Sequence, residues 1–528
     1  MTNFLANLPR LAILPGYLLA TIAIGWKSRL RQVVSNDFVN ASRAMPLWIV
    51  VAAFLSANSG ALEIVGLSAV AAQYGVQALH FYLIGAIPGM ILFGGTMIPV
   101  YMRNRIQSLP EYLEKRFDGR VRLINSWLIL AKVASVAGVG LYAMARVFHV
   151  VFGWHFTRGA VAIAIVVLVY VLLGGLRAAI YNEVFQLAIV ICGLAPLLFL
   201  TADKLPEAAA RSGSYWHLWT DLRFVSPNGN IDLFGVIAGL GLVLSFSYWC
   251  TDFVQVQRAL TAKSAETARM VPLLAGLGKL VFAYLVVIPA LAAPAFIGGN
   301  HITSFDETLP RLMVACYGPL MLSLGLTALL ASLMSGLAAN VSAFSAVWTE
   351  EIYRTSIRRD ASEAHYLLVA RIALLAGIGL SMVISYVCLN FKNLMEFVQM
   401  VFSIFGVPFF VVFLIGIFTR WATSSGALAG LLCGTVAASL FHLLVASGKL
   451  FFISSMSASF HAAVYAFCAS FAGSVLLSRR AERLSAEKLN LLVYKRDMED
   501  RSSRTAIGWW TLAGLLLVLC ATLNYLWR

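Results

Sequence analysis

The sequence predicts an all-α integral membrane protein with about 14 transmembrane helices. Of the 528 residues, 60% are apolar and only 12% are charged, whereas soluble globular proteins carry about 25% charged residues. The apolar residues form repeated runs of about 20 residues, the length that an α-helix needs to cross a bilayer. The sequence lacks the short alternating strands of an outer-membrane β-barrel. These observations exclude a soluble enzyme, a secreted module and a disordered protein.

Fourteen apolar runs are candidate spans when the chain is read with a window of about 19 residues. Lys27, Arg29 and Arg31 follow the first run in place of a small-residue cleavage site, so we expect a retained helix rather than a removed signal peptide. Most loops between the runs are short, and we expect no appended soluble domain. The predicted spans are 9–26, 46–73, 78–101, 123–151, 159–176, 184–203, 233–250, 270–297, 321–348, 366–389, 398–418, 424–446, 455–478 and 507–526.

Lysine and arginine predict the orientation of the chain. About 26 of the 39 lie in one alternating set of loops, which we expect to face the cytoplasm. The basic segment 479–506 belongs to this set, and an even number of spans places both termini on the opposite side. We therefore predict a plasma-membrane or bacterial inner-membrane protein with both termini outside. Its partners are then the lipid bilayer and a small-molecule solute, with no nucleic acid and no obligatory protein partner.

Residues 108–122 are expected to form a short amphipathic helix in a cytoplasmic loop. Ser108 and Glu111 have the spacing of a capping box, in which the serine side chain accepts a hydrogen bond from the backbone three residues later. The residues that follow alternate between apolar and charged types. We interpret this segment as a surface helix at the level of the lipid headgroups.

Two predicted spans are interrupted by residues that weaken a helix. The second contains SANSGALE (56–63), and the seventh contains GLG (239–241) followed by SFSYW (245–249). Irregular backbone at membrane depth is tolerated where it lines a cavity or is buried in protein, and interruptions at corresponding places in two halves indicate a transporter's binding site. Span order therefore predicts an N-terminal extra helix and loop, two five-helix repeats and additional C-terminal helices: 1–45, 46–203, 233–418 and 424–528.

Glu63, Lys132, Arg146 and Lys279 are four of the ionisable residues that lie inside predicted spans. A charge at the bilayer centre costs at least about 2.5–3.5 kcal/mol unless it is compensated. Glu63 and Lys279 lie deep in their spans, so they either form a buried structural ion pair or line a polar cavity. Lys132 and Arg146 either reach toward the membrane surface or form structural pairs.

Five motifs resemble those of the sodium:solute symporter family, particularly its sodium/glucose cotransporter branch. The resemblance covers about residues 10–440 and implies the leucine-transporter type of fold, with a 5+5 inverted repeat, broken first helices, an extra helix before the core, and alternating access. The motifs are NASRAMPLW (40–48), SLPEYLEKRF (108–117), GGLRAAIYNEVFQ (174–186), YWCTD with QRALTAK (248–263), and LASLMSGL with IY (330–353).

This resemblance implies a solute site between the broken helices. Lysine donates hydrogen bonds, amides donate and accept them, and aromatic faces stack on the C–H surface of a ring, which suits a sugar or polyol. Glu63 stands where the family has His or Gln, Tyr82 where it has a sugar-binding Glu, and Ser245 where some members have Asn. An acid at position 63 would favour an amine-bearing solute or pair with Lys279. The candidate solute residues are Asn58, Glu63, Tyr82, Ser245, Tyr248, Trp249, Lys279 and Gln399.

The resemblance also implies a sodium site between the first and eighth core helices. Sodium is a hard cation that prefers oxygen ligands. The family's ligands correspond here to backbone carbonyls of Ser56, Ser59 and Ser332 and to hydroxyls at 335 and 336. Ser335 keeps its hydroxyl, but the second position is Gly336. Glu183 matches an Asp near the family's intracellular ion route.

Several functions remain open from the sequence. The first is a secondary active symporter driven by sodium. A proton carried by Glu63 or Glu183 is the alternative coupling ion, and Gly336 leaves open an uncoupled facilitator. A transporter-like sensor would need a partner, because no signalling domain is attached. We expect no enzyme, because no HExxH, paired-carboxylate metal motif or nucleophile motif occurs.

Overall fold

The computed structural model describes residues 13–29, 45–106, 108–173, 176–206, 216–219, 231–297, 304–452, 454–479, 489, 491–494 and 504–527. Within these residues the secondary structure is helical, apart from an isolated bridge between Met45 and Ala262. Eleven described helices are long and apolar enough to span a membrane, or 12 if a bent pair counts as one span. The all-α membrane fold is confirmed, whereas the count of 14 is not.

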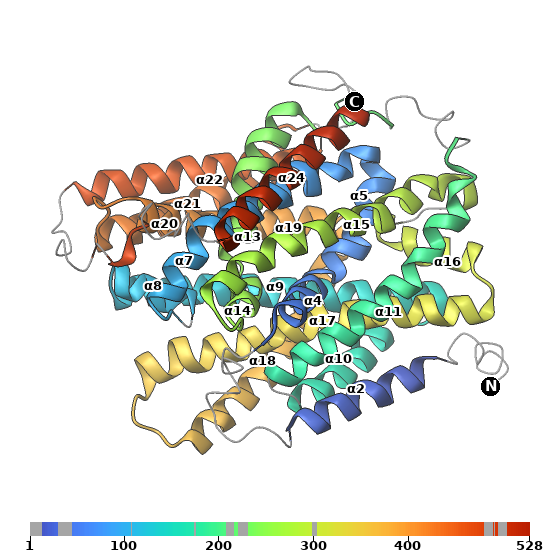
Figure 1. Cartoon of the computed structure of the whole chain (residues 1–528), viewed down its shortest axis with the longest axis horizontal. Coiled ribbons are helices and arrows are strands. Elements are labelled where there is room, and N and C mark those ends of the chain that lie inside the picture. Colours follow the sequence, from blue (N-terminus) through green and yellow to red (C-terminus); the bar gives the residue numbers. More distant parts are fainter. Residues whose placement is uncertain are drawn as a thin grey trace.

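The helices follow one another with few long connections (Figure 1). Where the sequence places Ser, Thr, Asn or Asp just before an apolar run, the side chain caps the first turn, as Asp118 does for α9 and Asn393 for α19. The elements are α2 (Leu14–Arg29), α4 (Leu47–Asn58), η3 (Leu62–Gly66), α5 (Leu67–Tyr74), η4 (Gly75–Leu79), η5 (Phe81–Ala86), α6 (Ile87–Leu92), η6 (Phe93–Met97), α7 (Ile98–Arg103), α8 (Leu109–Arg116), α9 (Gly119–Phe152), α10 (Phe156–Leu173), α11 (Leu176–Ala202), η8 (Gly235–Leu244), α13 (Ser245–Thr251), α14 (Phe253–Ala259), α15 (Ala265–Ile297), η10 (Phe305–Glu307), α16 (Thr308–Cys316), α17 (Pro319–Ala346), η11 (Val347–Ile357), α18 (Glu363–Cys388), α19 (Leu394–Val401), η12 (Phe402–Gly406), α20 (Val407–Phe418), α21 (Ser424–Ala446), α22 (Ser455–Ser478) and α24 (Arg504–Leu526).

The first core helix is broken where the sequence predicts. The α-helix α4 ends at Asn58, and helical structure resumes as the π-helix η3 at Leu62. Gly60 lies in the break and meets Gly336 of α17, since a Cβ on either glycine would lie 3.3 Å from the other's Cα. Glycine therefore allows the broken backbone to approach α17 closely.

The second interrupted helix is broken elsewhere than expected. The prediction of a break at 239–241 is wrong, because the π-helix η8 runs through these residues and continues as α13. The break lies at Asp252, whose backbone is extended (φ −72°, ψ 122°), and α14 leaves it at 53°. Gly239 has a packing role instead, because a Cβ there would lie 2.4 Å from the carbonyl oxygen of Phe460 on α22.

The predicted amphipathic helix is shorter and more buried than expected. The serine cap is present, since the Ser108 hydroxyl accepts from the backbone N–H of Glu111 at 3.2 Å. The helix α8 ends at Arg116 instead of 122, and α9 starts at Gly119. The fully buried Arg116 guanidinium donates to three backbone carbonyls at and beyond the end of α20, those of Gly416, Thr419 and Ala422. This helix is thus anchored to the bundle and is not a free surface helix.

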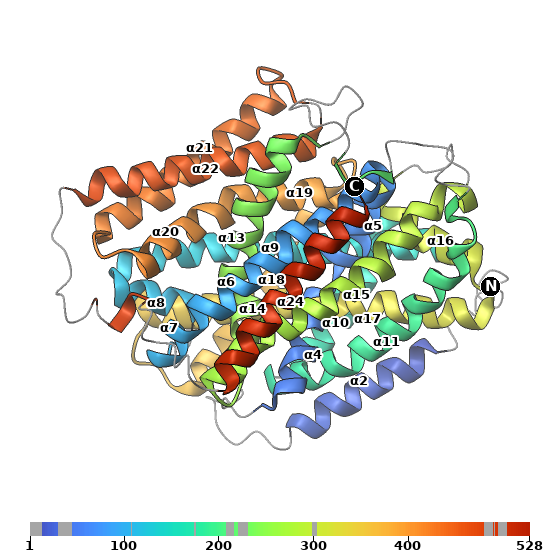
Figure 2. The same cartoon turned by 45° about the horizontal axis from the view of Figure 1, so that its top comes forward.

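The segments predicted inside and those predicted outside make contacts at two different ends of the molecule. The Tyr112 hydroxyl donates to the carbonyl of Leu492 at 3.1 Å, joining two segments predicted inside. The Leu218 N–H donates to the carbonyl of Trp527 at 2.9 Å, joining two segments predicted outside. In both ribbon views the start of α2 and the end of α24 lie away from α8 (Figures 1 and 2). Residues 30–43 of the basic loop 27–43, and most of 479–506 and 204–232, fall outside the described residues.

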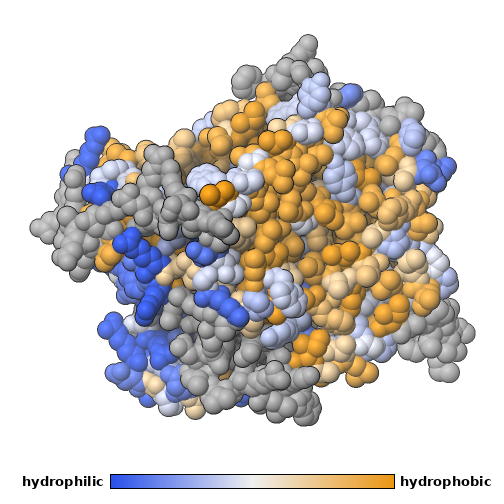
Figure 3. All heavy atoms as spheres, in the orientation of Figure 1, coloured by the Kyte–Doolittle hydropathy of each residue, from blue (hydrophilic) through white to orange (hydrophobic). Residues whose placement is uncertain are grey.

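The outer surface matches a lipid environment. Exposed leucine, valine and phenylalanine side chains cover α11, α18, α21 and α24. A broad hydrophobic surface fills much of the face in Figure 3, and hydrophilic residues gather at the end that carries α8. The chain is therefore an integral membrane protein. The boundaries of the two repeats stay a prediction.

Candidate functional site

One cavity of about 580 Å³ contains all eight candidate solute residues among its lining. It lies between η3, η5, the η8–α13 helix, α15 and α19, so residues more than 300 positions apart share one wall. The apolar part of the lining was not predicted. Its further members are Leu62, Leu67, Phe81, Ala86, Leu240, Leu244, Met395 and Phe402.

Glu63 and Lys279 form an ion pair inside this cavity. The Lys279 Nζ donates to Glu63 Oε2, and the two residues are 1% and 4% exposed. The sequence left a structural pair and a cavity lining as alternatives, and the geometry combines them. In the described part of the chain, Glu63 Oε1 has no hydrogen-bond partner.

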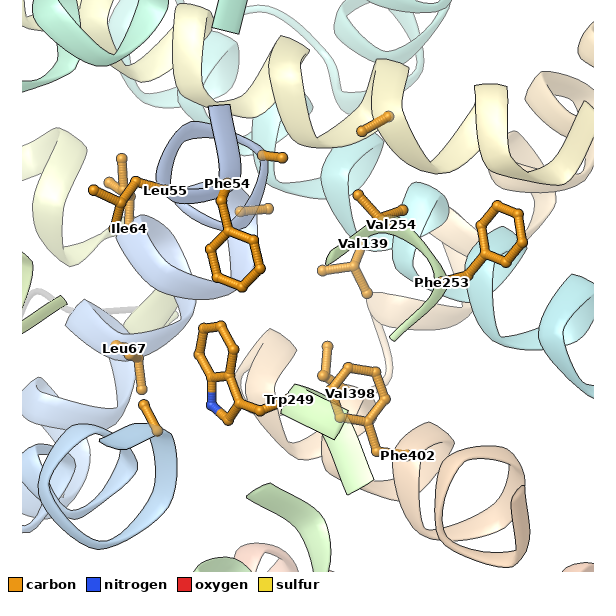
Figure 4. Packing of buried hydrophobic residues seen from close by; sticks show 14 of the residues in the cluster. Phe54, Leu55, Ile64, Leu67, Val139, Trp249, Phe253, Val254, Val398 and Phe402 are labelled. Atoms are coloured by element: carbon orange, nitrogen blue, oxygen red, sulfur yellow. The ribbon is translucent and has the colours of Figure 1, made fainter. Parts of the chain in front are cut away.

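Aromatic rings form a second wall of the cavity. Trp249 stacks on Phe54 of α4 with ring centroids 6.0 Å apart, and Figure 4 shows the two rings pointing toward one another. Tyr248 stacks on Phe402 at 5.3 Å and accepts a hydrogen bond from the Asn58 amide. This wall offers flat apolar faces beside polar groups, the arrangement that suits a sugar ring.

Two further polar side chains reach the cavity with unused hydrogen-bonding capacity. The Tyr82 hydroxyl and Gln399 Oε1 are buried and lack a partner among the described residues. The Gln399 Nε2 makes a weak contact with Met395 Sδ at 3.3 Å. Ser245 is also buried at the cavity, where α13 begins. Buried polar groups are normally satisfied, so these atoms are suited to a polar ligand.

The candidate sodium ligands gather where broken α4 meets α17. The Ser332 hydroxyl donates to the Ser59 carbonyl, and the Ser56 carbonyl accepts from the Ser59 N–H at 3.1 Å. The buried Ser335 hydroxyl lacks a partner in the described part. Ser335 follows Ser332 by about one helical turn on α17, and an orphaned hydroxyl in this position fits a hard cation.

Gly336 has a packing role in this region. A Cβ at this position would lie 3.3 Å from the Gly60 Cα, so a larger residue requires the two backbones to move apart by a few tenths of an ångström. The Gly336 carbonyl accepts from Asn340 Nδ2 at 2.8 Å, besides serving the helix. Asn340 was not singled out in the sequence, because an asparagine four residues along a helix carries no distinctive pattern.

Glu183 lies in another ion pair. Arg258 Nη2 is 2.7 Å from Glu183 Oε1, and both side chains are buried. The structure places Glu183 on α11 and Arg258 on α14, outside the cavity lining.

Both other charged span residues form structural pairs. Lys132 Nζ is 3.1 Å from Asp252 Oδ2 at the break between α13 and α14, and 4.9 Å from the Phe402 ring centroid. Arg146 Nη1 is 3.2 Å from Glu307 Oε1 on η10. The structural pairs that the sequence left as one alternative are therefore present for both residues. The partners lie far apart in sequence, which hid them from sequence reasoning.

A buried carboxyl, that of Asp306, was also missed by reasoning from the sequence. Asp306 accepts from the Leu394 N–H at the start of α19 and from the Tyr142 hydroxyl of α9, both at 2.9 Å. Burial raises the pKa of Asp306 to about 7, although these hydrogen bonds and Arg146 oppose the rise. Because α19 also carries Gln399, this carboxyl holds one wall of the cavity.

Comparisons with known proteins agree with this arrangement. The model of the sodium:solute symporter family matches residues 38–434. Sodium/glucose cotransporter 4 of Danio rerio is 29% identical over 81% of this chain and 70% of its own length. Sodium/glucose cotransporter 1 of Oryctolagus cuniculus is 26% identical over 81% and 71%, and the sodium/mannose cotransporter of Bos taurus is 27% identical over 80% and 77%.

Solved structures share the fold. A substrate-bound, outward-open Na+-coupled sialic acid symporter aligns with a TM-score of 0.74 at 17% identity, covering 90% of this chain and 99% of that one. The leucine-transporter type of fold is confirmed. The family and these relatives are transporters rather than enzymes. On the match across 38–434, the chain belongs to the sodium:solute symporter family.

Proposed function

We propose that the protein is a secondary active symporter that couples uptake of a small polar solute, first of all a sugar or polyol, to an inward sodium gradient by alternating access. One observation carries this proposal: the eight candidate solute residues share one cavity. Two of the candidate ion ligands, Ser56 and Ser59, lie on the same broken helix that contributes Asn58 and Glu63 to the cavity, and the others lie on α17, which meets it.

The geometry suggests how ion and solute are coupled. Residues 59–62, which include the break at Ser59 and Gly60, separate Asn58 from Glu63 in the chain. A sodium ion bound by the Ser59 carbonyl and α17 hydroxyls would order this break, and with it the two cavity residues on either side. Binding of one ligand then favours binding of the other, and this coupling is reciprocal.

Sodium is the favoured coupling ion. Glu63 and Glu183 were the candidate proton carriers, and each is held by a cation, Lys279 and Arg258 respectively. The relatives named above are sodium cotransporters, and they transport glucose or mannose by name. The stacked aromatic wall beside hydrogen-bonding groups supports the same class of solute for this chain.

Uptake by proteoliposomes tests the proposal. The purified protein is tested with sugars, polyols, amino acids and amines under an inward sodium gradient or an equal potassium gradient. We expect sodium-driven accumulation of at least one sugar or polyol. Accumulation that ignores sodium and follows a proton gradient would contradict the proposal.

Substitutions at the cavity test its location. Lys279→Ala and Gln399→Ala should each weaken uptake about tenfold to a hundredfold, because losing a hydrogen bond that involves a charged or buried group costs about 1.5–3 kcal/mol. Thermal unfolding of each variant in detergent controls for folding. Normal uptake by both variants would place the cavity elsewhere.

We further propose that both termini face outside and that 479–506 lies in the cytoplasm of a plasma or bacterial inner membrane. The eight Lys and Arg residues between Arg479 and Arg504 motivate this orientation. The end-to-end separation of loop contacts supports the alternation. A reporter fused after Arg528 that is active only in the cytoplasm would overturn it.

A further inference from the structure

The cavity carries one balanced pair of charges. Among its 16 lining residues, Glu63 and Lys279 are the ones with ionisable acidic or basic side chains. They come from different elements, η3 and α15, and pair with each other across the wall. Their combined charge is therefore zero before any solute enters.

Among the described residues, neither Glu63 nor Lys279 forms a second ion pair. Lys279 Nζ is otherwise near the rings of Trp249 and Phe282, at 5.7 and 5.9 Å from their centroids. Glu63 Oε1 lacks a partner among the described residues. A charged solute that captured one member would leave the other buried and unpaired, which is strongly unfavourable in a site of low dielectric.

The unused hydrogen-bonding atoms are mostly acceptors. Glu63 Oε1 accepts only, Gln399 Oε1 accepts, and the Tyr82 hydroxyl does both. A solute that donates through hydroxyl groups satisfies these atoms without disturbing the ion pair. An ammonium group would compete with Lys279 for Glu63, and a carboxylate would compete with Glu63 for Lys279.

We propose that the Glu63–Lys279 pair is the element that sets charge selectivity: the cavity accepts a solute without net charge that donates hydroxyl hydrogen bonds, and it rejects amine-bearing and acidic analogues of the same ring. This inference rests on the proposed function and deepens it. Glu63, which replaces the family's His or Gln, then excludes amine-bearing solutes instead of indicating an amine substrate.

Matched probes test the inference. Glucose, galactose and mannose are compared with glucosamine and glucuronate by equilibrium binding to the purified full-length protein in sodium. The wild type should bind at least one neutral sugar at least tenfold more tightly than glucosamine or glucuronate. Equal or tighter binding of a charged probe would overturn the inference while leaving sodium-coupled uptake intact.

Single substitutions should reverse the preference in opposite directions. Glu63→Gln leaves the Lys279 cation, so the affinity for glucuronate should rise at least tenfold relative to the affinity for glucose. Lys279→Met leaves the Glu63 carboxylate, so the affinity for glucosamine should rise by a similar factor. The double variant Glu63→Gln/Lys279→Met should return the neutral preference, because both charges are gone.

Two controls separate selectivity from folding. Glu63→Asp keeps the charge and should keep the neutral preference even if affinity falls. The unfolding temperature of the double variant should be higher than that of either single variant. An unchanged order of the probes in both folded single variants would overturn the inference. Failure of every probe and every solute of the wider panel to bind or to be taken up with sodium would instead contradict the proposed function.

Discussion

The two broken helices differ in where they break and in what surrounds the break. The first breaks at Ser59 and Gly60, between two cavity residues, and meets α17 through a glycine contact. The second crosses the cavity as continuous helix and breaks only at Asp252, where Lys132 pairs with the carboxylate. The first break exposes backbone oxygens beside the cavity, and the second keeps its break away from the lining.

This difference assigns a separate task to each helix. Backbone carbonyls and serine hydroxyls at the first break suit a cation, whereas the unbroken η8–α13 helix presents Tyr248 and Trp249 to a solute. A glycine allows close packing in both helices, but for different reasons. Gly60 allows an irregular backbone to approach α17, and Gly239 allows a regular helix to pack against α22.

Breaking the Lys132–Asp252 pair should have the largest effect. Lys132→Met or Asp252→Asn alone should destabilise the protein by about 3–5 kcal/mol, because a buried partner is left uncompensated. The double variant should recover most of this loss. Unfolding in detergent measures it, and single variants as stable as the wild type would show that the second break does not depend on this pair.

The glycine contact at the first break can be tested with two matched substitutions. Gly336→Ala adds a Cβ at 3.3 Å from the Gly60 Cα and should weaken sodium binding, since overpacking costs about 1–3 kcal/mol. Gly336→Ser adds the same Cβ with the hydroxyl found elsewhere in the family. Sodium should therefore bind more tightly to the Ser variant than to the Ala variant, and equal affinities would show that the hydroxyl does not reach the ion.

Two buried carboxyls, one beside each broken helix, should contribute to stability with opposite dependence on pH. Asp306 lies near α5 and has a pKa raised to about 7 by burial, so the stability that depends on its protonated form is present at low pH and lost as pH rises through about 7. Asp232, next to η8, is also buried, which raises its pKa. Hydrogen bonds from His461, Ser457 and the Gly235 N–H outweigh this and lower the pKa below the usual range. Its contribution is therefore lost as pH falls through that lowered pKa.

Unfolding temperatures from about pH 2 to 9, a range that extends below the ordinary aspartate pKa, check this contrast and give the smallest of these effects. Asp306→Asn should flatten the loss of stability between about pH 4 and about pH 7. Asp232→Asn should destabilise at neutral pH, where its hydrogen bonds to a carboxylate are otherwise present. Parallel pH profiles in both variants and the wild type would contradict the assignment.

Much of this architecture could be predicted from the sequence, because apolar runs and loop charge depend on local composition. The break at Ser59–Gly60 was predictable since four polar residues and a glycine interrupt one span. The break at Asp252 was missed because Gly239 and Gly241 carried the same signal, whereas their environment, α22 and Ile84, depends on distant packing.

The candidate site was likewise predictable in some parts and not in others. Motif resemblance indicated all eight solute candidates that line the cavity. The partners of charged residues were out of reach, since Lys132 and Asp252, or Asp306 and Leu394, meet only after the helices pack. The apolar lining was also hidden, because Leu240 and Met395 look like ordinary span residues in the sequence.

The sodium dependence of solute affinity tests the central claim most directly, namely that the first break binds the ion while the second helix faces the solute. Equilibrium binding of the sugar or polyol that the uptake panel identifies is measured in sodium and in equal potassium, for the wild type and for Ser335→Ala. We predict that sodium tightens solute binding at least tenfold in the wild type and less in the variant, with potassium affinities unchanged. Solute affinity that is equal in sodium and potassium would contradict the account.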